Sequence, residues 1–89
     1  MEITAGGNPG IAHDAQRQCF IAYCGESEAL LEYTLLANNG INFHHTFVPQ
    51  SMRGRGIAET LVKMALTWAR QHNFRVEASC WYVHRFLRD

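Results

Sequence analysis

This chain of 89 residues has little of what marks a secreted, metal-binding or membrane-spanning protein. Its three cysteines are an odd number without a C-x-x-C pair, so we expect neither a disulfide framework nor a bound metal, and a reducing, cytoplasmic location. No apolar run approaches the length of a membrane span, and no charged N-terminal segment precedes a hydrophobic one. Eight basic residues balance eight acidic ones, which gives no reason to expect nucleic acid or a membrane as a partner.

The bulk composition is that of a small globular protein. Apolar residues make up 47% of the chain and charged residues 18%, which is enough apolar content to form a core. We therefore expect a single minimal domain over residues 1–89. Residues 1–16, rich in glycine, asparagine and alanine, are expected to be an irregular start.

Apolar and polar residues alternate at period two over Ile41–Val48, which predicts a strand. Pro49 cannot donate to a sheet ladder, so the strand is expected to end there. His44 is predicted to point to the opposite face from His45. The residues predicted to share one face are Ile41, Phe43, His45 and Phe47.

The segment Ala29–Leu36 is ambiguous, because its leucines suit a helix whereas Tyr-Thr and the Asn38-Asn39-Gly40 turn favour a hairpin.

The histidines His13, His72 and His84 have no ligand spacing and are expected at the surface. The other predicted elements are a strand Cys19–Tyr23, a helix from Ile57 to His72–Asn73 that carries Trp68 on its apolar stripe, a strand Phe74–Cys80 and a short helix Tyr82–Leu87.

A basic, glycine-rich turn, Arg53-Gly54-Arg55-Gly56, leads directly into the predicted helix. Glycine permits positive φ and close approach of a ligand, and the first N–H groups of a helix carry the positive end of its dipole. The turn is therefore suited to phosphate or pyrophosphate, although a plain strand-to-helix loop would also use glycine. A P-loop is excluded because Ile57 and Ala58 follow Gly56, and a dinucleotide fingerprint because Glu59 stands at the third glycine position.

The pattern Arg53-x-x-Gly56-x-Ala58 after Val48-Pro49 resembles the acetyl-CoA signature of the GNAT acyltransferase superfamily. Further blocks, in order from about Gln18 to the C-terminus, resemble the minimal, YjdJ-like branch of that superfamily. Relatives usually carry a glutamate where this chain has Phe47, so no acid–base role is implied there. The matching blocks are His45-Thr46-Phe47-Val48-Pro49, Arg53-Gly54-Arg55-Gly56-Ile57-Ala58, Leu61-Val62, Ala69-Arg70 and Cys80-Trp81-Tyr82-Val83.

The resemblance favours a strand for Ala29–Leu36 and implies a short GNAT core of class α/β. The expected order β-β-β-α-β-α suits a mostly antiparallel sheet with one right-handed crossover, which places the strand Arg75–Cys80 parallel to Ile41–Val48. The implied ligand is acetyl-CoA. Its binding site would comprise Val48 and the turn residues Arg53, Gly54, Arg55, Gly56, Ile57 and Ala58, with the thioester near Cys80.

Cys80 has two alternative interpretations: it is a small buried apolar residue, or it is a functional thiol. A functional thiol needs a neighbour that lowers its pKa, and His45 is the residue that the predicted register places best. The resemblance implies that this cysteine and histidine act as a pair. Tyr82 matches the region where larger relatives keep a tyrosine that protonates the leaving thiolate, although its ring could simply pack.

The expected function is therefore transfer of an acetyl group from acetyl-CoA to an amine. A short connection between Tyr23 and Ala29 leaves the acceptor side open, which suits an amine on a protein or peptide. The alternatives are a non-catalytic CoA-binding accessory domain, and more distantly a phosphate- or nucleotide-binding interaction module.

Overall fold

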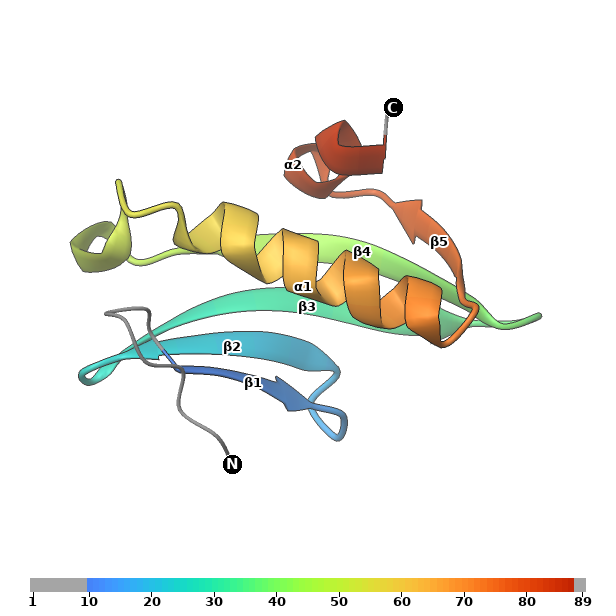
Figure 1. Cartoon of the computed structure of the whole chain (residues 1–89), viewed down its shortest axis with the longest axis horizontal. Helices are drawn as coiled ribbons and strands as arrows, with labels where there is room; N and C mark the ends of the chain where they lie inside the picture. Colours follow the sequence, from blue (N-terminus) through green and yellow to red (C-terminus); the bar gives the residue numbers. More distant parts are fainter. Residues whose placement is uncertain (1–9, 88–89) are drawn as a thin grey trace.

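The computed structural model describes residues 10–87. Five strands form one sheet in the order β1-β2-β3-β4-β5, and helix α1 lies across one face of it (Figure 1). The pairs β1–β2, β2–β3 and β3–β4 are antiparallel, and the pair β4–β5 is parallel, which confirms the expected α/β class and crossover. The elements are β1 (Gly10–Asp14), β2 (Cys19–Cys24), β3 (Ser27–Leu36), β4 (Gly40–Phe47), η1 (Gln50–Met52), α1 (Ile57–Gln71), β5 (Arg75–Ala78), α2 (Trp81–His84) and η2 (Arg85–Leu87).

Two tight hairpins connect the middle strands of the sheet. Gly25, between β2 and β3, has φ of 63°, and Asn38 and Asn39, between β3 and β4, have φ of 61° and 60°. The left-handed pair Asn38–Asn39 matches the twist of an antiparallel hairpin, and the ambiguous leucine-rich segment is a strand paired on both sides. The hairpin interpretation of this segment is confirmed.

Strand β1 corrects the prediction that residues 1–16 are irregular. Residues 10–14 pair with β2 in an antiparallel register, Ile11 opposite Ala22 and His13 opposite Phe20. The composition of this segment is poor for a strand, and its pairing comes from the tertiary position of β2. Residues 15–16 form a turn, and residues 1–9 of the predicted irregular start lie outside the described residues.

The core lies between α1 and the sheet. The helix presents an apolar stripe to the sheet at helical spacing, as its sequence predicts. No helix within residues 10–87 is long and apolar enough to cross a membrane. The buried residues of α1 are Ile57, Leu61, Val62, Ala65, Leu66 and Ala69, and the sheet residues that meet them include Phe20, Ala22, Leu31, Tyr33, Ile41 and Phe43.

A β-bulge in β4 overturns the prediction of one continuous alternation. Tyr33 pairs with Phe43 but Glu32 pairs with His45, so His44 is an extra residue without a partner on β3. An inserted residue reverses the facing of everything beyond it. Phe43 therefore faces α1, whereas His45 faces away from it and Thr46 faces towards it.

Candidate functional site

The basic turn between β4 and α1 has a defined backbone structure. The 3-10 turn η1 closes with backbone bonds from Met52 N–H to Pro49 O (2.9 Å) and from Arg53 N–H to Gln50 O (3.2 Å). Gly54 and Gly56 have φ of 81° and 71°, and Gly56 is the N-cap of α1. A Cβ built at either glycine would meet no protein atom within 4 Å, so the space over the turn is open.

A cavity of about 230 Å³ opens at this turn. It joins the helix N-terminus to Tyr82 of α2, so the structure brings two sequence-predicted parts of the site together. Met52 and Glu59 also line it and had no distinguishing sequence signal. The lining residues are Val48, Met52, Arg53, Gly54, Gly56, Ile57, Ala58, Glu59 and Tyr82.

The charges around this cavity suit an anion. The first N–H groups of α1 have no carbonyl partner within the helix and carry the positive end of its dipole. Arg53 is held in place, because its Nε donates to the Val48 carbonyl at 3.0 Å. The Glu59 carboxylate pairs with Lys63 Nζ at 2.9 Å, which partly offsets its negative charge.

The Arg55 side chain contacts Cys24 and not the cavity. Its guanidinium lies 3.2 Å from the Cys24 sulfur, and Arg55 is not among the residues that line the cavity. The two arginines of the turn therefore occupy different positions, although they are only two residues apart. A pyrophosphate role for Arg55 stays a prediction.

Strands β4 and β5 separate next to the turn. Their pairing covers only Gly40–Phe43 with Arg75–Ala78, followed by a bond of 3.2 Å from Cys80 N–H to the Phe43 carbonyl. Strand β4 continues to Phe47, so its last residues have no β5 partner. The predicted strand Phe74–Cys80 is accordingly shorter than expected and ends at Ala78.

Cys80 lies at this separation, at the N-cap of α2. Its sulfur is 3.5 Å from the Thr46 hydroxyl. Burial raises the pKa of the thiol, but the Thr46 hydroxyl and the backbone N–H groups of Val83, Tyr82 and Thr46 favour the thiolate, and the net effect lowers the pKa below its ordinary value. The hydrogen bonds thus outweigh burial in their effect on the thiol pKa.

The structure does not bring His45 to Cys80. Thr46, the next residue along the strand, faces Cys80, and consecutive strand residues point to opposite faces. His45 pairs with Glu32 on the face away from α1 and is exposed. The predicted register would have placed His45 beside the cysteine, and the bulge at His44 is the physical reason for the difference.

The position of Cys80 is fixed by two residues that the sequence did not single out. Asn42 Nδ2 donates to Ser79 Oγ, and Ser79 N–H donates to Asn42 Oδ1, both at 3.0 Å. This reciprocal pair attaches β4 to the connection that carries Cys80. Neither residue belongs to a recognisable sequence motif, and only their cross-strand proximity identifies them.

Comparisons with known proteins agree with this arrangement. Residues 18–89 match the family described as GCN5-related N-acetyl-transferase. Protein NATD1 of Mus musculus is 31% identical over 89 residues, covering 98% of this chain and 81% of that protein. Protein NATD1 of Bos taurus is 32% identical over 81 residues, covering 89% and 72% respectively.

A solved structure is similar as well. The NMR structure of a GCN5-like protein from Staphylococcus aureus has a TM-score of 0.70 and 28% identity, and the match covers 92% of this chain and 80% of that one. The family match spans the glycine turn, the separated strands and Cys80. The chain belongs to the GCN5-related N-acetyltransferase family.

Proposed function

We propose that this protein binds acetyl-CoA and transfers its acetyl group to an amine. The observation that carries the proposal is the open cavity at the N-terminus of α1, next to the end of β4 that has no β5 partner. Cys80 contacts this end of β4 through Thr46. Family membership supports an acyltransferase, and this region contains the groups that such a ligand needs.

The turn is the proposed pyrophosphate site. Backbone N–H groups from Gly54 to Ala58 and the Arg53 guanidinium supply donors, and the glycines leave space for close approach. The unpaired backbone of β4 beyond Phe43 offers hydrogen-bond partners to the amide-rich pantetheine arm. This direction along the strand would bring the thioester to Cys80.

Two routes of acyl transfer fit the thiol. In the first, the Cys80 thiolate attacks the thioester carbonyl, and the CoA thiolate leaves and takes a proton from the Tyr82 hydroxyl. The amine then attacks the acyl-cysteine, the Cys80 thiolate leaves, and the proton lost by the amine returns to Tyr82. In the second, the neutral amine attacks the thioester directly and Cys80 only lines the pocket. Proximity of the bound reactants supports either route.

A CoA-binding accessory domain is the second candidate. Glu59 is the carboxylate among the described residues that line the cavity, and it is paired with Lys63. Within residues 10–87 this cavity therefore offers an acceptor amine no unpaired carboxylate as a general base. The acceptor would have to arrive deprotonated. An amine exposed on a protein or peptide suits the open site, because only Gly25 and Glu26 connect β2 to β3.

The binding half of the proposal is tested by titration calorimetry with CoA on two matched variants. Gly56→Ala and Gly25→Ala each force a side chain into a left-handed position with no atom nearby, so each should cost about 1 kcal/mol of stability. Gly56→Ala should also weaken CoA binding about tenfold, since its methyl group stands where the pyrophosphate approaches. Gly25 does not line the cavity, and its variant should bind normally. Absence of CoA binding by the unmodified protein at high micromolar ligand would contradict the proposal.

The transfer half is tested with radiolabelled acetyl-CoA and a mixed pool of peptides and amines. Label on an acceptor supports the enzyme, and binding without transfer supports the accessory domain. Loss of transfer in Cys80→Ala with CoA binding retained would assign the acyl-enzyme route. Transfer at the normal rate in that variant would assign direct attack.

A further inference from the structure

A second cavity lies on the other side of α1, against the edge strand β1. Its volume is about 540 Å³, within the range of roughly 300–1,000 Å³ typical of small-molecule pockets. It shares no lining residue with the cavity at the glycine turn. The residues that line it are Ile11, Ala12, His13, Phe20, Lys63, Met64, Thr67, Trp68 and Gln71.

The inner wall of this cavity is a rigid aromatic cluster. The His13 and Phe20 rings are stacked with centroids 4.2 Å apart, and the Trp68 ring meets His13 edge-on at 4.5 Å. A hydrogen bond of 2.6 Å joins His13 Nε2 to the hydroxyl of buried Tyr33, which fixes the His13 ring. His13 is exposed, as the sequence predicts, and its ring nevertheless packs into this cluster.

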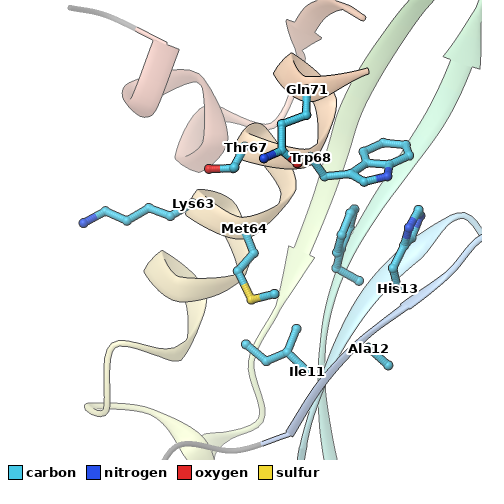
Figure 2. Close-up of a pocket in the computed structure, with 9 residues that line it drawn as sticks. Ile11, Ala12, His13, Lys63, Met64, Thr67, Trp68 and Gln71 are labelled. Atoms are coloured by element: carbon cyan, nitrogen blue, oxygen red, sulfur yellow. The ribbon is translucent and has the colours of Figure 1, made fainter. Parts of the chain in front are cut away.

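The outer wall is apolar and open. Met64 extends from α1 towards Ile11, and the Lys63 side chain points away from the cavity (Figure 2). Lys63 is paired with Glu59, and the side chain of Met64 is 44% exposed. Methionine adapts its shape to apolar ligands and makes favourable contacts with aromatic rings. The cavity thus presents the His13 and Trp68 rings to solvent, and Lys63, the charged residue among the described residues that line it, is paired with Glu59.

We propose that this cavity is a binding site for an uncharged planar aromatic ring system of one or two fused rings. Aromatic walls favour ring stacking and edge contacts, and the fixed cluster loses little conformational entropy on binding. Thr67 and Gln71 at the rim supply hydrogen-bond partners for a polar edge. The ring belongs to a free small molecule, because the volume of the cavity is that of a small-molecule pocket.

The test uses indole as the probe, followed by amide and indole N–H shifts in two-dimensional NMR of the full chain. Saturable shifts at Trp68, Met64 and His13, without shifts at Gly56, are expected. N-acetyltryptophanamide in a second titration tests the occupant. Weaker binding than indole is expected for a small-molecule site, whereas tighter binding would overturn this assignment in favour of an aromatic side chain of a peptide. Shifts at Gly56 alone, or no saturable shift, would overturn the proposal.

Matched charge substitutions on α1 complete the test. Met64→Glu places a carboxylate in the cavity and should weaken indole binding at least tenfold, whereas Arg70→Glu adds the same residue outside it and should change binding less than twofold. Thr67→Glu replaces Met64→Glu if the latter does not fold. Equal binding in all variants contradicts the site. Nuclear Overhauser contacts between the Trp68 ring and residues 1–9 in the free protein would also overturn it, because the chain itself would then occupy the cavity.

Discussion

Thr46 is the residue through which β4 acts on the Cys80 thiol. Its hydroxyl lies 3.5 Å from the sulfur and, together with backbone N–H groups, lowers the thiol pKa despite burial. Thr46→Val keeps the shape and removes the hydroxyl. Because a hydrogen bond of this kind is worth about 1 kcal/mol, the midpoint of Cys80 alkylation against pH should rise by about half a unit to one unit. Mass spectrometry of the Cys80 peptide after iodoacetamide treatment measures this midpoint.

His45→Ala is the control for Thr46→Val. His45 faces away from Cys80, so its removal should leave the alkylation midpoint unchanged. A rise in His45→Ala equal to that in Thr46→Val would restore the thiol–imidazole pair expected from the sequence. Cys19 serves as an internal reference in the same samples, since burial raises the pKa of its thiol.

At the scale of elements, the bulge in β4 lies at His44, directly after Phe43, the last residue of β4 that pairs with β5. A bulge bends its strand and increases the local twist. Deleting His44 should leave the pairs Glu32–His45 and Leu31–Thr46 in register, because His44 has no partner on β3. We expect the free energy of unfolding to change by only about 1 kcal/mol, whereas CoA affinity should fall about tenfold as the strands close. Urea unfolding and calorimetry measure the two quantities.

His44→Ala is the control for that deletion. It shortens an exposed side chain but keeps the residue count, so the bulge and CoA affinity should both remain. A folded deletion variant that binds CoA normally would mean that the strand separation does not depend on the bulge.

At the scale of the whole molecule, His13 links the edge strand β1 to β3 and α1. Burial lowers the pKa of its imidazole below the ordinary 6.5; the Asp14 carboxylate raises it, and His72 lowers it further. The folded chain therefore resists protonating this imidazole more than the unfolded chain does. This contribution to stability is complete above pH 6.5 and is lost as the pH falls through the folded-state pKa.

The expected result is a free energy of unfolding that decreases on acidification from pH 7 to about 5, with a smaller decrease in His13→Phe. Tyr33→Phe removes the hydrogen bond but not the burial, so its pH dependence should persist. Urea unfolding at several pH values provides the measurement. An unchanged slope in His13→Phe would exclude His13 as the titrating group.

The sequence by itself determined the features of this protein that depend on local conformational preferences. Glycine spacing predicted the turn at Gly54 and Gly56, helical periodicity predicted α1, and the Asn38-Asn39-Gly40 turn favoured the hairpin that the structure contains. Each of these depends on residues close together in the chain, whose conformational preferences act wherever the segment lies. The family and its α/β class also followed from motif order alone.

Tertiary structure alone decided the features that depend on distant partners. The bulge at His44 is visible only in the pairing of β4 with β3, and it reversed the facing of His45 and Thr46. Strand β1 has a weak strand sequence and forms because β2 offers it an edge. Register and burial arise from residues far apart in the chain, and a one-residue shift exchanges the two faces of a strand. That is why the sequence located Cys80 but only the fold identified Thr46 as its neighbour.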